Sequence, residues 1–336
     1  MSRAASIITT AWLIAALWPR LAAAAASTPD ALLSAGAPDI SGAAPPTEPL
    51  YAVATRLDRI GRIIAPVTIN GRGPFHFMVD TGANRTVLAE SLLQQLELPL
   101  DHDNLVSVIG VSGTAVVATA QVRSLDAGAL HFRNVQLPVL TGPVLLGIDG
   151  ILGMDGFDGK LVSADFVKDR LTISQSLGRP ASFEYSVVPI KFLSERLCMI
   201  DAYVGHVRTK AIIDTGGAHT LGNPALLRAL LRARTSGESF GADAGVIDAT
   251  QSSLVGKMGR VPLVQFGGAT IDDLEVTFGD FRVFKTWGLE DKPALLLGMD
   301  VLGTLAELTI DYRRKELDLI PRVYHLDIDS RTAIER

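Results

Sequence analysis

The order of apolar and polar residues in the middle of the chain is typical of short β-strands. Residues 62–70 alternate between the two kinds, and residues 75–79 predict a short strand that ends in the apolar run 77–79. Glycine and proline at residues 71–74 predict a turn between these strands. Residues 199–204 and 209–213 predict two further strands with a glycine between them. Each half of the chain is therefore expected to begin with two strands joined by a turn.

A helical pattern follows each set of strands. Leucines recur on one face of residues 89–96 and again of residues 224–234, as in an amphipathic helix. Pro224 stands in the first turn of the second helix, where its missing N–H costs little. The rest of each half is β-rich with frequent glycine. The fold class expected is all-β, with one short helix in each half.

The two halves are copies of one sequence. Residues 71–96 align with residues 205–230 without a gap, at an offset of 134 residues. Residues 151–155 then correspond to residues 296–300 at an offset of 145, so the second copy carries 11 more residues before this point. We expect two homologous lobes joined near residues 175–185. The identical positions of the first alignment are Gly71 and Gly205, Asp80 and Asp214, Thr81 and Thr215, Gly82 and Gly216, Thr86 and Thr220, Leu92 and Leu226, Leu93 and Leu227, and Leu96 and Leu230.

The N-terminus has the layout of a secretory signal peptide. One positive charge at Arg3 precedes the apolar residues 4–18, and the alanines of residues 22–26 offer cleavage sites. Pro19 and Arg20 interrupt the apolar run before it reaches the roughly 20 residues that a membrane-spanning helix needs. We therefore expect export to the periplasm or the medium, with cleavage and no stable membrane insertion, rather than an uncleaved membrane anchor.

Composition sets the remaining boundaries. Residues between the signal peptide and the first strands are rich in Ala, Pro, Ser and Gly and have no periodicity, which predicts a flexible linker or a propeptide. The expected domains are a signal peptide at residues 1–26, a linker or propeptide at 27–55, a first lobe at 56–178, a second lobe at 179–322 and a C-terminal tail at 323–336.

Charge and cysteine content exclude several classes of protein. The 336 residues carry a formal net charge of −5, which offers no basic surface for nucleic acid. The single cysteine, Cys198, excludes an intramolecular disulfide and a cysteine-based zinc cluster, and its apolar surroundings predict a buried thiol. Asp149, Asp155 and Asp158 miss the spacing of a calcium loop, so a structural loop is expected there. We expect no metal and no cofactor.

Two Asp-Thr-Gly triplets, at residues 80–82 and 214–216, carry the candidate chemistry. Each follows an apolar run and precedes a threonine at the same spacing, and each has an apolar-apolar-Gly segment further on, at residues 151–153 and 296–298. These combined motifs resemble the aspartic proteases, and within them the retropepsin-like branch, over about residues 56–320. The resemblance implies two acid-protease lobes with the active site in the cleft between them, and apolar-apolar-Gly segments buried beneath the triplets.

Paired carboxyl groups suit the hydrolysis of an amide. Two of them about 3 Å apart cannot both ionise, so the pair shares one proton and offers a base for water and an acid for the substrate. Asp80 and Asp214 are therefore the candidate catalytic residues. We expect an exported aspartic endopeptidase that acts on a peptide or protein substrate.

The other triplet residues support the catalytic loops. Gly82 and Gly216 allow the tight turns that bring the two loops together without a Cβ in the way. By the resemblance, Thr81 and Thr215 cross-link the loops through hydrogen bonds from hydroxyl to backbone.

The sequence departs from the pepsin-like pattern next to each triplet. Pepsin-like members often have a hydroxyl residue there, which favours the charged carboxylate, whereas this chain has Ala83 and Gly217. We therefore expect raised pKa values and an activity optimum in the weakly acidic to neutral range. None of the 5 tyrosines lies between a triplet and its matching glycine segment, where pepsin-like proteins carry a flap tyrosine. This favours the retropepsin-like branch.

Flaps and substrate contacts are also expected. The glycine-punctuated residues 107–117 and 236–251 are candidate flaps, and because one chain supplies both lobes we expect a monomer. Arg85 and His219 stand three residues beyond each triplet glycine. Two interpretations of them stay open, contact with the substrate backbone and a surface or salt-bridge role.

A second function from another class also stays open. A catalytically silent protein with the same fold would bind a peptide or an envelope component in its cleft without cutting it. Retention of both aspartates and both threonines favours the enzyme, because a pure binder has no chemical need for carboxyl groups that share a proton.

Overall fold

The computed structural model describes residues 8–9, 52–54, 56–57, 62–142, 145, 147–193, 196–233, 239–248, 250 and 253–322. Most of the predicted signal peptide and linker, and the whole predicted tail at residues 323–336, lie outside these ranges. Within the predicted signal peptide only β1 (Ile8–Thr9) is described, as a short strand at the edge of the first-lobe sheet, paired with β7. Within the predicted linker, β2 (Ala52–Ala54) is described as a strand.

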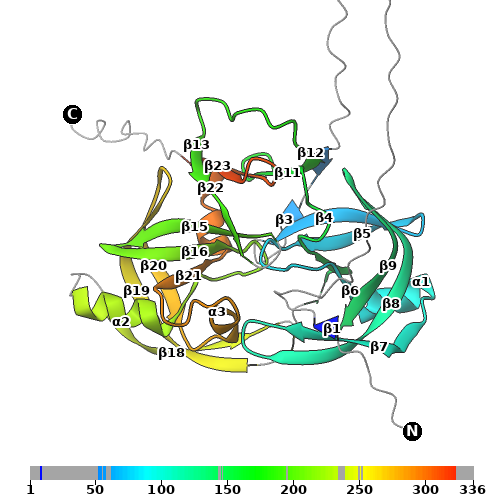
Figure 1. Cartoon of the computed structure of the whole chain (residues 1–336), viewed down its shortest axis with the longest axis horizontal. Coiled ribbons are helices and arrows are strands. Elements are labelled where there is room, and N and C mark those ends of the chain that lie inside the picture. The colour runs from blue at the N-terminus through cyan, green and yellow to red at the C-terminus, as the bar shows by residue number, and fades with distance from the viewer. Residues whose placement is uncertain are drawn as a thin grey trace, which may run out of the picture.

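The first lobe is a nine-stranded sheet in the order β1-β7-β8-β9-β6-β10-β5-β4-β3 (Figure 1). Its hairpin of β4 and β5 is the predicted one, but its turn holds only Asn70 and Gly71, and Arg72 already begins the second strand. Asn70 and Gly71 both have a positive φ, which Asn and Gly adopt most easily. The elements are β3 (Arg56–Leu57), β4 (Ile63–Ile69), β5 (Arg72–Val79), β6 (Val87–Ala89), α1 (Glu90–Leu96), β7 (Leu100–Ile109), β8 (Thr114–Ala127), β9 (Leu130–Leu140) and β10 (Gly150–Leu152).

The second lobe repeats this plan in an eight-stranded sheet, in the order β14-β15-β16-β21-β17-β20-β19-β18. In each lobe the strand that leads to an aspartate pairs in parallel with the strand of the apolar-apolar-Gly segment, β5 with β10 and β16 with β21. The elements are β14 (Lys191–Leu193), β15 (Leu197–Val204), β16 (Val207–Ile213), β17 (Leu221–Gly222), α2 (Pro224–Ala233), β18 (Ser239–Ile247), β19 (Ser253–Phe266), β20 (Ala269–Phe278), α3 (Arg282–Thr286), β21 (Ala294–Leu297) and α4 (Met299–Leu302).

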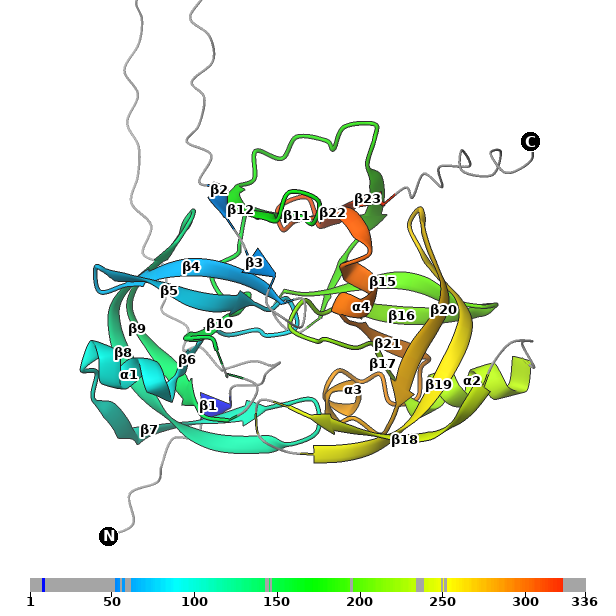
Figure 2. The same ribbon diagram turned by 180° about the vertical axis from the view of Figure 1, so that it is seen from behind.

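A third sheet of six strands joins the lobes and was not predicted. Its order is β13-β23-β22-β11-β12-β2, and each half of the chain supplies three of its strands. At its centre β11 and β22 pair antiparallel, with Val162 opposite Ile310. Figures 1 and 2 show this sheet on one side of the molecule, above both lobes. Its elements not yet given are β11 (Lys160–Asp165), β12 (Arg170–Gln175), β13 (Ser186–Pro189), β22 (Leu305–Asp311) and β23 (Glu316–Pro321).

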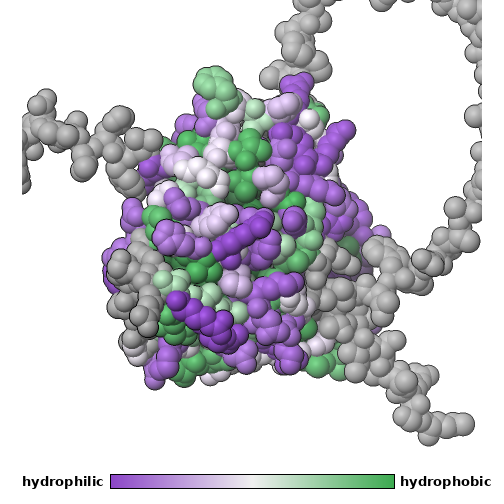
Figure 3. Space-filling model, turned by 60° about the vertical axis from the view of Figure 1, so that its left-hand side comes forward, coloured by the Kyte–Doolittle hydropathy of each residue, from purple (hydrophilic) through white to green (hydrophobic). Residues whose placement is uncertain are grey.

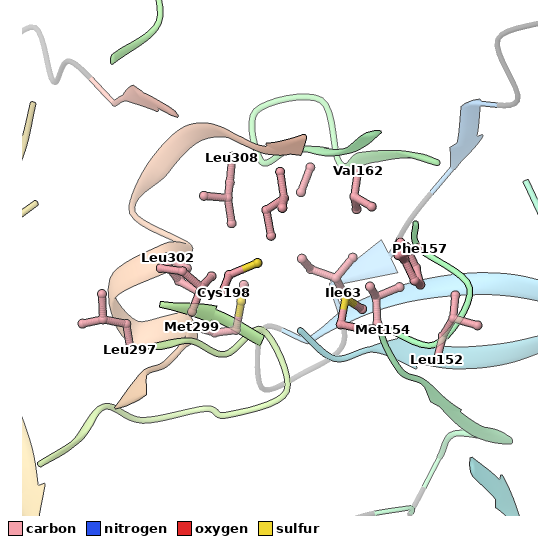
Figure 4. Packing of buried hydrophobic residues seen from close by; sticks show 14 of the residues in the cluster. Ile63, Leu152, Met154, Phe157, Val162, Cys198, Leu297, Met299, Leu302 and Leu308 are labelled. Atoms are coloured by element: carbon pink, nitrogen blue, oxygen red, sulfur yellow. The ribbon is translucent and has the colours of Figure 1, made fainter. Parts of the chain in front are cut away.

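One hydrophobic core runs beneath this sheet from lobe to lobe. Met154 of the first lobe and Cys198 of the second both belong to it, and Figure 4 shows the two sets of side chains facing one another. The hydroxyl of Tyr312 lies 2.6 Å from the sulfur of Met154 and ties the two sets together. Cys198 is buried, as predicted, and burial raises the pKa of its thiol to about 12. A continuous core fixes the position of one lobe relative to the other.

The second lobe differs from the first mainly beside its helices. The loop between β9 and β10 covers residues 141–149, whereas the loop between β20 and β21 covers residues 279–293 and contains α3. The helix α2 has 10 residues and α1 has 7. The additional residues of the second copy therefore lie mostly around α3 and after α2, and little in the flap. The helices α3 and α4 were not predicted, because 5 and 4 residues are too few for a periodic pattern.

The surface mixes hydrophilic and hydrophobic residues. On the face in Figure 3 the two kinds alternate in small groups. In the part of the chain that the structure describes, no helix has the length and apolar character needed to cross a membrane.

Candidate active site

The two aspartates stand at the same place in the two lobes, directly after β5 and after β16. The backbone N–H of Asp80 donates to the carbonyl of Leu152 at 3.1 Å, and that of Asp214 donates to the carbonyl of Leu297 at 3.0 Å. Both accepting residues end buried strands, β10 and β21, as the resemblance implied. The parallel pairing of strands thus brings each aspartate to the centre of the molecule.

The two carboxyl groups lie together in the interior. Asp80 is 0% exposed and Asp214 is 3% exposed. The N–H of Gly82 donates to Oδ1 of Asp80 at 2.8 Å, and the N–H groups of Gly216 and Gly217 donate to Oδ1 of Asp214 at 3.0 and 3.1 Å. Each of these N–H groups stabilises a negative oxygen.

Glycine is required on both loops because each faces the carboxyl group of the other lobe. A Cβ on Gly82 would lie 2.5 Å from Oδ1 of Asp214. A Cβ on Gly216 would overlap the carboxyl group of Asp80 in the same way. Any side chain at either position would push the two carboxyl groups apart.

Different surroundings act on the pKa values of the two carboxyl groups. Burial, and after it the charge of Asp214 and a hydrogen bond with that residue, raises the pKa of Asp80 well above its ordinary value. Burial also raises the pKa of Asp214, but hydrogen bonds from Asp80 and from two backbone N–H groups oppose it. Both shifts keep a proton on the buried pair, and the two carboxyl groups titrate as one unit.

The two threonines cross-link the catalytic loops, as the resemblance implied. The hydroxyl of Thr81 donates to the carbonyl of Ile213 at 2.8 Å and accepts from the N–H of Thr215 at 3.1 Å. The hydroxyl of Thr215 donates to the carbonyl of Val79 at 2.7 Å and accepts from the N–H of Thr81 at 3.1 Å. Four buried hydrogen bonds thus hold the two aspartates at a fixed separation.

Two further aspartates support the loops that carry Asp80 and Asp214, and the sequence analysis did not predict this role. In the first lobe Asp155 accepts from the N–H and the hydroxyl of Thr86, at 2.8 and 2.7 Å. In the second lobe Asp300 accepts the same two bonds from Thr220, at 2.8 and 2.7 Å. The signal was present, because both aspartates belong to the repeated Gly-Met-Asp segment. These pairs hold each catalytic loop against the strand segment beneath it.

Arg85 and His219 lie beside these supporting aspartates. The charge of Arg85 acts on Asp155 and that of His219 on Asp300, in each case opposing the rise in pKa that burial causes. Arg85 is half-buried and His219 is exposed. The charge of each residue thus favours the ionised form of its neighbouring aspartate, and contact of either residue with a substrate stays a prediction.

Asp149, Asp155 and Asp158, for which a structural loop was expected, have separate partners. Asp149 accepts from the N–H of His76 at 2.7 Å, Asp155 binds Thr86, and Asp158 forms an ion pair with Arg196 of the other lobe. Within the described ranges, no group of three His, Cys, Asp or Glu side chains is placed to hold a metal ion.

Two long hairpins correspond to the candidate flaps. The turn between β7 and β8 covers residues 110–113, within the candidate at residues 107–117. The turn between β18 and β19 covers residues 248–252 and belongs to the second candidate flap, residues 236–251. Residues 236–238, 249 and 251 of this candidate lie outside the described residues. Both Figures 1 and 2 show these hairpins meeting on the side of the molecule opposite the six-stranded sheet.

Comparison with known proteins agrees with this geometry. The aspartyl protease family model matches residues 65–155 and again residues 200–301, one match in each lobe. No curated protein matches the chain. Together the two matches cover more than half of the chain and contain both aspartates, both threonines and both Gly-Met-Asp segments. The chain therefore belongs to the aspartyl protease family, in a form that carries two retropepsin-like lobes in one polypeptide.

Proposed function

We propose that the protein is an exported aspartic endopeptidase, which hydrolyses peptide bonds with a water molecule activated between Asp80 and Asp214. The observation that carries the proposal is the pair of carboxyl groups buried together between the two lobes, where burial raises both pKa values. Burying carboxyl groups costs stability, and a protein that only bound peptides would gain nothing from that cost. The family also supports a peptidase.

In the proposed reaction each carboxyl group has one role in each step. Asp214 takes a proton from water while the water oxygen attacks the carbonyl carbon, and Asp80 gives its proton to the carbonyl oxygen. The neutral diol then collapses, with Asp80 recovering a proton from one hydroxyl as the C=O bond re-forms. Asp214 gives its proton to the leaving nitrogen as the C–N bond breaks. Both groups return to their starting states.

The substrate in this proposal is an extended peptide. It would lie in the cleft between two β lobes, where backbone hydrogen bonds bind the strand and its alternate side chains point to opposite sides. Both lobes belong to one chain, so the proposed active form is a monomer. Export rests on the signal-peptide pattern of residues 1–26.

The test is cleavage of a peptide library by the purified protein without residues 1–26, followed by mass spectrometry. We expect the wild type to cut peptides and the double variant D80N/D214N to cut none. Asp103→Asn, which changes an exposed carboxyl on β7, is the matched control and should cut like the wild type. If the wild type binds library peptides but cuts none, the proposal is wrong and a binding function replaces it.

A further inference from the structure

The two flap turns are in direct contact through one buried carboxylate. Asp248, at the start of the second flap turn, is 5% exposed. Its Oδ2 accepts hydrogen bonds from the N–H groups of Ser112 and Gly113 in the first flap turn, at 2.6 and 3.2 Å. Its Oδ1 accepts from the N–H and the hydroxyl of Thr250, at 2.9 and 2.6 Å. One oxygen thus binds the opposite flap and the other fixes the carboxylate within its own turn.

The first flap is shaped to receive this carboxylate. Gly110 packs against Asp248 so closely that a Cβ there would overlap both carboxylate oxygens. The φ of Gly110 is not in the left-handed region, and the three atoms nearest to an added Cβ all belong to the carboxyl group of Asp248. The N–H of Gly110 donates to the carbonyl of Gly113 at 2.7 Å, which closes the turn whose amides face the carboxylate.

An apolar contact accompanies these hydrogen bonds. Val111, between Gly110 and Ser112, is 8% exposed and belongs to a hydrophobic cluster made otherwise of buried residues from the second lobe. Phe284, Trp287 and Leu296 are members of that cluster, and the first two belong to the enlarged loop around α3. The tip of the first flap is therefore bound to the second lobe by both a charged and an apolar contact.

We propose that Asp248 is a positioning residue that latches the first flap shut over the catalytic pair. Charge-assisted hydrogen bonds to backbone N–H groups are the strong kind, and here they are shielded from water. Resting on the proposed function, the latch has a role in turnover, because a flap must open to admit a peptide and then close to exclude water. The latch is formed in the peptide-free protein and must break before a peptide enters, so its loss enlarges the fraction of open flap and lowers KM more than it changes kcat.

The first test measures amide hydrogen exchange in the peptide-free protein, which requires no activity. In Asp248→Ala we expect the amides of residues 110–113 to exchange at least about tenfold faster than in the wild type, since a lost charge-assisted hydrogen bond is worth about a factor of ten. Asp248→Asn keeps one acceptor oxygen and should lie between the two. Asp243→Asn is the matched control, because this exposed carboxylate of β18 forms an ion pair with Lys257 of the same hairpin. Exchange unchanged by Asp248→Ala would overturn the proposal.

The second test breaks the same contact from the other lobe. Gly110→Ala should speed exchange as Asp248→Ala does, whereas Gly245→Ala should not, because a Cβ there meets nothing within 4 Å. When Gly110→Ala and Asp248→Ala are combined, the shorter side chain at position 248 leaves room for the new methyl group at position 110. The double variant should therefore exchange no more than about twofold faster than Asp248→Ala alone. Additive effects of the two changes would show that they act on separate contacts and would refute the latch.

The third test uses a peptide that the wild type cleaves. We expect Asp248→Ala to lower KM, by up to about tenfold, while kcat stays within about threefold, a split that general destabilisation would not produce. A fall confined to kcat would contradict the positioning role. If the wild type cleaves no peptide, the proposed function fails, and the exchange measurements still decide whether the latch exists.

Discussion

Removing the hydroxyl of one cross-linking threonine should weaken the whole molecule. Thr81→Val keeps the shape of the side chain but removes one donor and one acceptor. The carbonyl of Ile213 and the N–H of Thr215 then lose their bonds of 2.8 and 3.1 Å in a region where Thr81 and Thr215 are each 2% exposed. A buried polar group left without its partner costs about 1–3 kcal/mol. Two such groups give an expected loss of about 4 kcal/mol in the free energy of unfolding.

The assay is urea unfolding at neutral pH, with the free energy extrapolated to water. Thr81→Ser is the matched control, because it keeps the hydroxyl and removes one methyl group, at a cost of about 1 kcal/mol. The mirror variant Thr215→Val should lose as much as Thr81→Val, since its two bonds are 2.7 and 3.1 Å long. If Thr81→Val is no less stable than Thr81→Ser, the cross-link does not hold the loops together and the reasoning is refuted.

Three further predictions concern charge and space. Burial raises the pKa of Asp318 to about 6, so the folded protein keeps this proton at pH values where the unfolded chain has released it, and stability falls as pH rises. Asp318→Asn should therefore match the wild type near pH 4 and exceed it by about 1–2 kcal/mol at pH 7 in urea unfolding; an unchanged difference between the two pH values would contradict this. Because the pKa of Asp80 is well above its ordinary value, the proton needed for catalysis is retained into the weakly acidic to neutral range, and a pH–rate profile that peaks below about pH 3 would oppose it. Gly82→Ala should lower kcat/KM at least about a hundredfold, because its Cβ would lie 2.5 Å from Asp214, with an unchanged circular dichroism spectrum; near-normal activity would count against a tightly paired site.

The meeting of the two aspartates could be predicted from the sequence because this part of the fold is built from the repeat. An identical spacing in two copies places Asp80 and Asp214 at the ends of equivalent strands, and a pseudo-twofold arrangement then brings them together. The threonine cross-link was implied by the family resemblance alone. The supporting aspartates, Asp155 and Asp300, could have been found by asking what the repeated Gly-Met-Asp segments hold.

The parts that the sequence did not predict are those where the two copies contact each other or differ. The six-stranded sheet pairs strands from opposite halves of the chain, and β2 joins it from within the predicted linker. No local sequence pattern predicts such long-range pairing. The latch is asymmetric, because one carboxylate of the second flap binds backbone N–H groups of the first. Backbone N–H donors cannot be recognised from the pattern of side chains. The contact of Asp248 with the first flap could therefore not be predicted from the sequence.

The account depends most on catalysis by the two aspartates acting as a pair. The most direct measurement is kcat/KM for one identified peptide with the wild type, Asp80→Asn and Asp214→Asn. Asn can neither take up a proton from water nor give one to the substrate, so we expect each variant to lose at least about a thousandfold. Either variant retaining activity within about tenfold of the wild type would contradict catalysis by this pair.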